Sequence, residues 1–284
     1  MRRIALFAAG MLLAAAGVQG SYAADSIPAN TWVRVADCPG DAEGREVPPG
    51  RASTWTYCPP LKAFLRYGGY TPRFSNAMDQ FDPATGKWKR LAAEDENYPT
   101  NRPGGGCLWA VQYDDKRQLV WLGAGVANGF AGSQGIWSYD PKTGKFDAGS
   151  TNLAPGVVRM CFDPGNGLFV AQPWPKSNGM GEGSTMIFTV EDRKWQAVRT
   201  APSPQPLWGG HLFPMTYDAG LSRVVAIAGE KGPTNEVWTF DGAARQWEQL
   251  PTSNGPSFRM RSVIAADPDN KVIMLHGVHP GGYT

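Results

Sequence analysis

One short motif recurs along the chain and constrains its fold more than any other feature. The segment Phe81–Trp88, which reads Phe-Asp-Pro-Ala-Thr-Gly-Lys-Trp, returns almost unchanged at Tyr139–Phe146. A degraded copy occupies Phe240–Trp247, and a shortened one occupies Val190–Trp195. The closing aromatic residues lie 58, 49 and 52 positions apart. Such a period indicates a repeat architecture, because one unit of this size cannot bury its own apolar faces without a neighbour.

Each repeat has the pattern of four short strands. In the second repeat we expect strands at 108–113, 119–122 and 135–139, and an outer strand around Phe146. In the turn before the outer strand, Asp caps local amides, Pro fixes φ, and Gly supplies a backbone conformation that other residues resist. Four-stranded units of this length are typical of β-propeller blades. We therefore predict an all-β propeller with blades at 52–92, 103–148, 155–199 and 209–250 and a partial blade at 260–284.

A glycine pair adds a family resemblance. Gly68 and Gly69 follow the second expected strand of the first repeat, and Phe81, Asp82 and Trp88 follow the third. This pattern resembles the kelch motif, and the resemblance extends over about residues 31–284. It implies a kelch-like β-propeller similar to the central domain of galactose oxidase. It does not imply one activity, because kelch-like propellers include enzymes, sugar-binding proteins and protein-docking platforms.

The two ends of the repeat region are incomplete. Residues 31–36 match an outer strand such as 87–91, but no other strand precedes them. In kelch-like propellers such an orphan strand closes the last blade and removes exposed sheet edges. At the other end, two expected strands at 261–266 and 272–276 are followed only by a short tail to Thr284. We expect about four complete blades and a partial closing blade, truncated at the C-terminus from a six- or seven-bladed ring.

The first 23 residues have the layout of a secretory signal peptide. Arg2 and Arg3 precede an apolar run, and small residues lead to an expected cleavage site near Ala23 or Ala24. The run is too short for a membrane-spanning helix, so we expect no membrane attachment after cleavage. The mature chain, residues 24–284, is then expected to be secreted or periplasmic.

Charge excludes one class of partner. The chain has 27 Lys and Arg residues and 25 Asp and Glu residues, and loss of Arg2 and Arg3 leaves 25 of each sign (27 − 2 = 25). A neutral mature chain argues against nucleic-acid binding, which favours a strongly basic surface. Any preference for charged ligands then depends on local arrangement.

Cysteine and histidine usage leaves two further questions open. The four cysteines are Cys38, Cys58, Cys107 and Cys161. Disulfides among them are possible in an oxidising compartment, but the sequence does not determine which cysteines pair. The three histidines have no spacing typical of a zinc site, so no metal is predicted: His211, His276 and His279.

Strand alternation predicts which loops share one end of a blade. The loops that enter the first strand carry arginines and one histidine, and the loops between strands two and three are long and glycine-rich. The resulting candidate ligand-binding residues are Arg51, Arg102, Arg159, His211, Arg259, Arg261 and Trp174, with Arg73, Phe74, Asn76, Asn128, Phe130, Lys176, Asn178, Lys231 and Asn235 nearby. Basic side chains beside aromatic and amide groups suit a carboxylate, a sugar acid or an acidic protein loop.

Each of these residues also has a structural interpretation. An arginine before the first strand can satisfy loop carbonyls or pair with an acid of a neighbouring blade, and Trp174 can cover a blade edge. The repeated aromatics Trp88, Phe146, Trp195 and Trp247 are expected to pack between blades. Asp114 and Asp115 lie in a turn, where we expect them to be solvated.

We therefore expect an exported binding module for a carbohydrate or an acidic protein partner. The alternative is a carbohydrate-active enzyme. The kelch resemblance implies either an isomerase similar to periplasmic sialic-acid mutarotases, which needs no metal, or a copper-radical oxidase similar to galactose oxidase. Copper is expected only for the oxidase, where late histidines such as His276 and His279 would be candidate ligands. No catalytic residue is assigned.

Overall fold

The structure is a computed structural model that describes eleven ranges of the chain. These are residues 54–70, 74–93, 101–104, 108–124, 135–150, 157–173, 184–204, 214–228, 236–252, 263–267 and 270–276. The predicted signal peptide and the orphan strand at 31–36 lie outside these ranges. Within the described residues, no helix is long and apolar enough to span a membrane.

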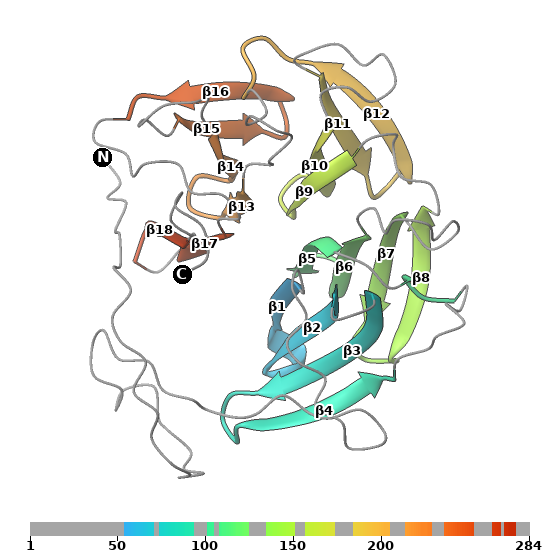
Figure 1. The fold of residues 1–284 in the computed structure, drawn as a ribbon. Helices are drawn as coiled ribbons and strands as arrows, with labels where there is room; N and C mark the ends of the chain where they lie inside the picture. Colours follow the sequence, from blue (N-terminus) through green and yellow to red (C-terminus); the bar gives the residue numbers. More distant parts are fainter. Residues whose placement is uncertain are drawn as a thin grey trace. The chain divides into compact units, whose positions relative to one another are not determined.

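The described strands form four four-stranded antiparallel sheets and one two-stranded sheet, and they are coloured along the chain in Figure 1. Blade 1 comprises β1 (Thr54–Cys58), β2 (Ala63–Tyr70), β3 (Phe74–Asp82) and β4 (Lys87–Ala92). Blade 2 comprises β5 (Leu108–Asp114), β6 (Leu119–Ala124), β7 (Gly135–Asp140) and β8 (Lys145–Ser150). A 3-10 turn, η2 (Pro59–Leu61), joins β1 to β2.

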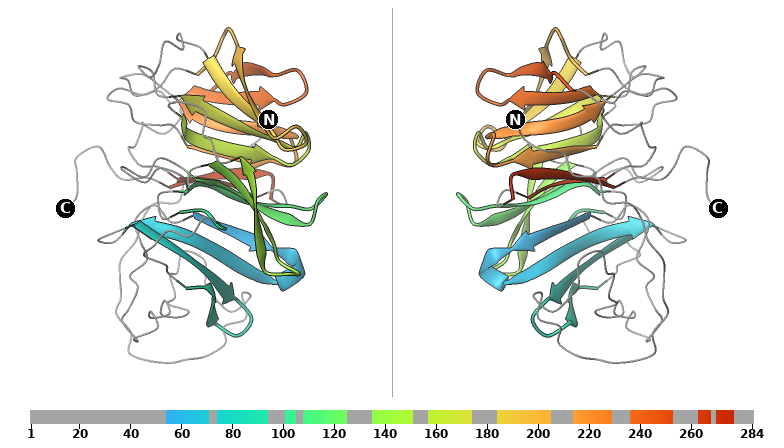
Figure 2. Two further views of the ribbon diagram at one scale, coloured as in Figure 1. Left: turned by 90° about the vertical axis from the view of Figure 1, so that its right-hand side faces the viewer. Right: turned by 90° about the vertical axis from the view of Figure 1, so that its left-hand side faces the viewer.

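The second half of the chain repeats this order. Blade 3 comprises β9 (Val157–Asp163), β10 (Leu168–Pro173), β11 (Ser184–Thr189) and β12 (Lys194–Arg199). Blade 4 comprises β13 (Met215–Asp218), β14 (Arg223–Ala228), β15 (Glu236–Asp241) and β16 (Gln246–Leu250). The last sheet pairs β17 (Val263–Asp267) with β18 (Val272–His276). Figure 2 shows the strands of each sheet side by side in two further views. The predicted all-β fold, with four complete propeller-type blades and a partial one, is confirmed.

The chain divides into two compact units. The N-terminal unit, Phe7–Thr151, contains blades 1 and 2, and the C-terminal unit, formed mainly by Asn152–Thr284, contains blades 3 and 4 and the two-stranded sheet. Each unit has its own apolar core. In the N-terminal unit, Leu65 and Tyr67 of blade 1 pack with Val120 and Leu122 of blade 2. In the C-terminal unit, Val170 and Ile187 of blade 3 pack with residues of blade 4 such as Val224 and Phe240.

An in-register row of apolar side chains crosses every blade. The rows are Tyr57–Phe64–Phe81–Trp88 in blade 1, Tyr113–Val120–Tyr139–Phe146 in blade 2, Phe162–Phe169–Phe188–Trp195 in blade 3 and Tyr217–Val224–Phe240–Trp247 in blade 4. Residues opposite one another in neighbouring strands share a face of the sheet. The four blades are therefore built to one plan, as the repeat predicted.

The prediction that the closing aromatics pack between blades is confirmed for two of them. The Phe146 ring lies 6.0 Å from the Tyr67 ring of blade 1. The indole nitrogen of Trp247 donates a hydrogen bond of 2.8 Å to the Thr185 hydroxyl of blade 3. Trp88 has its described ring contacts within its own blade.

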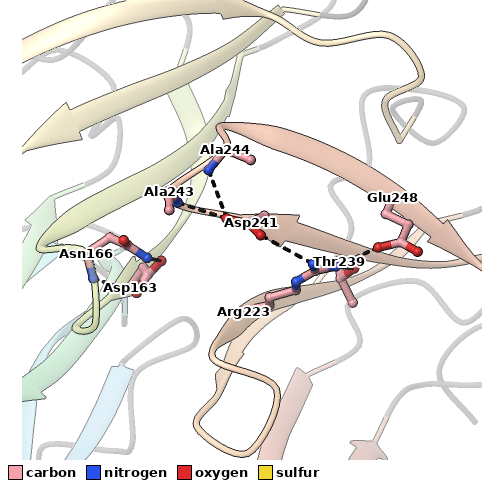
Figure 3. Close-up of polar contacts among 8 residues, drawn as sticks. All are labelled: Asp163, Asn166, Arg223, Thr239, Asp241, Ala243, Ala244 and Glu248. Atoms are coloured by element: carbon pink, nitrogen blue, oxygen red, sulfur yellow. Dashed lines mark hydrogen bonds and ion pairs between the residues drawn. The ribbon is translucent and has the colours of Figure 1, made fainter.

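The repeated turn has the predicted chemistry. The Asp82 and Asp140 carboxylates each accept a hydrogen bond of 2.8 Å from the backbone N–H two residues ahead, and Gly86 and Gly144 have φ angles of 65° and 70°. These amide donors, together with threonine hydroxyls, lower the pKa of both carboxyl groups. In the degraded copy, Asp241 accepts from Ala243 and Ala244 in the same way (Figure 3).

A second repeated turn joins the first two strands of blades 2, 3 and 4, and the strands of the two-stranded sheet. It begins with Asp114, Asp163, Asp218 or Asp267, and a residue with positive φ follows four positions later: Gln118, Gly167, Ser222 or Lys271. The expectation that Asp114 is solvated is wrong, because its side chain is fully buried. Backbone amides, the Arg117 guanidinium at 2.9 Å and the Trp121 indole at 3.1 Å satisfy the carboxylate there.

Two of the four cysteines are described, and both are buried free thiols. Cys58 ends β1 in the N-terminal unit, and Cys161 lies in β9 of the C-terminal unit. Burial raises the pKa of both thiols. The possible disulfide is therefore not formed by Cys58 or Cys161, and Cys38 and Cys107 lie outside the described residues.

Candidate functional site

Of the predicted ligand-binding residues, Arg102 is the one whose side chain the structure describes. Arg159 lies in β9 opposite Gln172, and only its backbone is described. The other five predicted residues lie outside the described ranges: Arg51, Trp174, His211, Arg259 and Arg261. Arg102 and the end of β2 belong to the N-terminal unit and the end of β10 belongs to the C-terminal unit, so each is described by itself.

Arg102 precedes blade 2, as predicted, and its side chain is partly buried. One terminal nitrogen, Nη2, donates a hydrogen bond of 2.6 Å to the Ala93 carbonyl oxygen. This hydrogen bond to a loop carbonyl is the structural role that we expected for an arginine before the first strand of a blade. The Nε atom of the same guanidinium is buried and has no hydrogen-bond partner among the described residues. Arg102 thus supports a loop with one nitrogen and leaves another donor unused.

Tyr67 of β2 is a site residue that the sequence did not single out. Its hydroxyl donates a short hydrogen bond to the carbonyl oxygen of Pro103, the residue after Arg102. Burial raises the pKa of the Tyr67 phenol, and the positive charge of Arg102 opposes that shift. Tyr67 is therefore neutral at physiological pH, and it orients the segment that carries Arg102. In the sequence, its position directly before the glycine pair Gly68-Gly69 could have identified Tyr67 as a candidate.

The glycine pair shapes the end of β2. Gly68 and Gly69 have φ angles of 68° and 129°, a region that side chains with a Cβ rarely adopt. The register of β2 and β3 shifts between Tyr67 and Gly69, which marks a β-bulge. The bulge ends the regular ladder just after Tyr67, at the end of the blade that faces Arg102.

Blade 3 has a polar side chain at the position that corresponds to Tyr67. Gln172 ends the apolar segment Leu168–Ala171, lies opposite Arg159, and is followed by a register shift at Pro173. Its side chain is 7% exposed, and its amide nitrogen Nε2 has no hydrogen-bond partner among the described residues. A buried amide without a partner is costly, so such groups often mark a ligand or water position. In the sequence, Gln172 could have been identified as a single polar residue that follows an apolar strand segment.

The loop assignments need one correction. Phe74 and Asn76 were expected in the loop between strands two and three, but both lie within β3, which begins at Phe74. The Asn76 side chain is fully buried. Its burial within β3 separates Asn76 from the loop residues with which it was grouped. Arg73, Asn128, Phe130, Lys176, Asn178, Lys231 and Asn235 lie outside the described ranges.

The described part of the chain offers no cluster of three or more His, Cys, Asp or Glu residues that could hold a metal ion. His276 ends β18, its side chain is not described, and His279 lies outside the described ranges. The described hydrogen-bond donor of the N-terminal unit is the guanidinium of Arg102, and that of the C-terminal unit is the amide of Gln172. Such donors can hold a carboxylate or carbonyl oxygen.

No protein family and no curated protein matches the chain. Among solved structures, TolB from Acinetobacter baumannii is similar, with a TM-score of 0.48 and 14% sequence identity. The match covers 78% of this chain and 47% of the TolB chain, so it spans about half of that protein.

Proposed function

We propose that this chain is an exported, kelch-like β-propeller that acts as a binding module for a ligand bearing a carboxylate, either an acidic sugar or an acidic protein loop. The binding groups are the arginines of the loops that enter the first strands, and Tyr67 supports the segment that carries Arg102. Binding without turnover is the proposed activity, and no described residue is assigned a catalytic role.

The observation that carries the proposal is the state of Arg102. Its guanidinium is anchored to Ala93 by Nη2, whereas Nε is buried and lacks a partner within the described residues. A buried donor without an acceptor costs about 1–3 kcal/mol, and a ligand oxygen that accepts from it recovers that free energy. Anchoring also reduces the conformational entropy that Arg102 loses on binding.

The proposed function predicts a defined loss of affinity. In the double variant Arg102→Ala/Arg159→Ala, the affinity for glucuronate should fall by about 10-fold or more, because a charge-assisted hydrogen bond contributes about 1.5–3 kcal/mol. The wild-type affinity should also weaken as salt rises, because the interaction is between charges. Isothermal titration with glucuronate, with glucose as the neutral counterpart, measures both effects.

The matched control is Arg199→Ala, which removes an exposed arginine of the outer strand β12. It should leave the affinity for glucuronate unchanged. An acidic peptide tested in the same way separates a sugar ligand from a protein loop. Binding that is equal for glucuronate and glucose, or unchanged in the double variant, contradicts the proposal.

A further inference from the structure

Two turns of blades 3 and 4 meet at a buried carboxylate. Asp163 ends β9, and its side chain is fully buried. Its oxygens accept hydrogen bonds from the backbone nitrogen of Asn166 at 3.1 Å and from the Asn166 side-chain amide at 2.9 Å. Figure 3 shows this pair beside the blade-4 turn that holds Ala243 and Ala244. Asp163 therefore belongs both to its own turn and to the contact between two blades of the C-terminal unit.

The blade-4 turn approaches Asp163 through a glycine. A Cβ atom at Gly242 would collide with Asp163 Oδ2 and would lie 2.6 Å from Asn166 Nδ2. The corresponding residues of blades 1 and 2 are Pro83 and Pro141, both of which carry a Cβ. The motif thus has a glycine in blade 4, where the neighbouring turn occupies the space of a side chain.

A second contact joins the same two blades. A Cβ atom at Gly165 would lie 2.9 Å from the Tyr217 hydroxyl oxygen of β13 and 3.2 Å from Asp163 Oδ1. Two elements of blade 4 therefore pack against one turn of blade 3. We call this contact of Asp163, Asn166, Tyr217 and Gly242 the blade 3–4 junction.

Asp163 lacks the cation that its counterpart in blade 2 has. Asp114 occupies the same turn position, is equally buried, and pairs with Arg117 three residues later at 2.9 Å. The residue three positions after Asp163 is the neutral Asn166, and no described cation forms an ion pair with Asp163. A buried carboxylate without a cation is costly, because it gives up hydration that nothing of opposite charge replaces.

Neutral and acidic groups surround Asp163. Cys161 of the same strand and Tyr217 of β13 are neutral, and burial together with the charge of Asp163 raises the pKa of both. Two acids of blade 4 lie on the elements packed against this turn, Asp218 at the end of β13 and Asp241 at the end of β15. These groups do not offset the charge of Asp163.

Two arginines of blade 4 are engaged with other groups. Arg223 of β14 lies 3.3 Å from Asp241 and 2.6 Å from Glu248 (Figure 3). Arg245 of the turn after β15 donates a hydrogen bond of 2.5 Å to the Gln196 side chain of β12. Neither arginine has a described ion pair with the carboxylate of the junction.

The protonation of Asp163 therefore depends on folding. Burial raises the pKa of its carboxyl group, the charge of Asp241 adds to the rise, and hydrogen bonds from Asn166 and Gly165 oppose it. In an unfolded chain the group titrates near about pH 3.9. Because the native group binds a proton at higher pH than the unfolded one, this group increases the free energy of unfolding as the pH falls from neutral. The gain is complete below about pH 4 and is lost as the pH rises through the native pKa.

We propose that the blade 3–4 junction is a pH-sensitive latch, which holds the two blades together more tightly when Asp163 binds a proton. Protonation removes the cost of a buried charge and the repulsion between Asp163 and Asp241. The latch lies at the end of blade 3 away from the loop that enters β9, so it does not depend on the proposed ligand site.

Hydrogen exchange of the exported protein at about pH 7 and about pH 5 tests the latch. Mass spectrometry gives the protection factor of each peptide, which corrects for the intrinsic pH dependence of exchange. We expect the protection of peptides from β9 and from β13 to β16 to rise at least about threefold at the lower pH. The rise should disappear in Asp163→Asn. No rise in the wild type, or an equal rise in the variant, overturns the proposal.

Two further variants separate the latch from a general effect of acid. Asp114→Asn removes a carboxylate that is equally buried but paired with Arg117, and it should leave the pH response of the blade-4 peptides intact. Asn166→Arg keeps Asp163 and gives it a cation at the position that Arg117 has, so the response should disappear. Asn166 is exposed, so this variant decides the question even if Asp163→Asn does not fold. A response that persists in Asn166→Arg contradicts the role of Asp163.

Gly242→Ala tests the close approach of the two turns. The added Cβ collides with Asp163 Oδ2, so the protection of the blade-4 peptides should fall at least about tenfold at both pH values. Unchanged protection would mean that the blade-4 turn does not rest on Asp163, and the latch would then have no structural basis.

Discussion

The first position of the turn between strands one and two is an aspartate in blades 2, 3 and 4, but it is Cys58 in blade 1. A residue with positive φ follows four positions later in both cases, with 49° at Lys62 and 57° at Gln118. Asp114 and the other aspartates cap the turn with charged oxygens, whereas Cys58 interacts with the backbone of Leu61 and stays buried. A single residue can therefore change the chemistry of a repeat position without changing its fold.

The tryptophan position shows the same principle and yields a prediction. Trp247→Phe removes the donor to Thr185 and leaves that buried hydroxyl without its indole partner, whereas Trp88→Phe removes a donor that has no described acceptor. Both substitutions remove the same atoms, so the difference between their effects on the free energy of unfolding reports on the hydrogen bond of Trp247. We expect Trp247→Phe to lower the free energy of unfolding by about 1 kcal/mol more than Trp88→Phe. Urea unfolding of the two variants measures the difference, and equal losses would refute the assignment.

At the scale of elements, the hairpin turns of the blades depend on one residue in the left-handed conformation. Glycine fills this position in three described turns, at Gly86, Gly144 and Gly167, but Lys62, Arg193 and Arg245 adopt the same conformation with φ angles of 49°, 53° and 55°. The left-handed region is unfavourable for a residue with a Cβ. The chain thus tolerates local strain where the strands on either side determine the register.

This strain leads to a pair of opposite predictions. Lys62→Gly should raise the free energy of unfolding by about 0.5–1 kcal/mol, because relief of strain exceeds the added entropy of the unfolded glycine. Gly144→Ala should lower it by about 1 kcal/mol, since a Cβ there meets nothing within 4 Å and only the φ of 70° opposes it. Thermal unfolding of both variants checks the signs. A loss of stability in Lys62→Gly would mean that its side chain contributes more than the strain costs.

At the scale of the whole molecule, each compact unit carries one described free thiol that reports on its unfolding. Cys58 belongs to the core of the N-terminal unit and Cys161 to that of the C-terminal unit. Both thiols are almost inaccessible, and burial raises their pKa values, so neither should react in the native protein. Each thiol is therefore expected to become reactive only when its own unit opens.

A core substitution in one unit should expose only its own thiol earlier. Leu65→Ala removes fully buried atoms of the N-terminal unit, which costs about 2–5 kcal/mol. Pulsed iodoacetamide labelling across a urea series, read by mass spectrometry, should show labelling of Cys58 at lower urea than in the wild type. Labelling of Cys161 provides the comparison within the same sample. Rapid labelling of Cys58 in native protein would contradict its burial.

Local signals in the sequence were sufficient to predict the blades. Asp140-Pro141 and Gly144 define a turn by their own chemistry, and the short apolar-rich segments around Val120 and Trp137, bounded by turn residues, define strands. Both patterns depend on residues close in the chain. Arg102 was identified as a candidate from its place before a strand. Tyr67 and Gln172 were not, since their roles depend on hydrogen-bond partners, present or missing, that local patterns do not reveal.

The sequence by itself determined the repeat, the four-stranded units, the turn chemistry and the small formal net charge of +2. Tertiary structure alone decided which polar groups are satisfied. It placed Asp114 in the interior with its amide and indole donors and anchored one nitrogen of Arg102 on Ala93. It also gave Trp247 an acceptor, whereas Trp88 has none among the described residues. The physical reason is the separation in sequence of the interacting residues. Turns and strands depend on residues that are neighbours in the chain, whereas burial and hydrogen-bond partners depend on distant segments that the fold brings together.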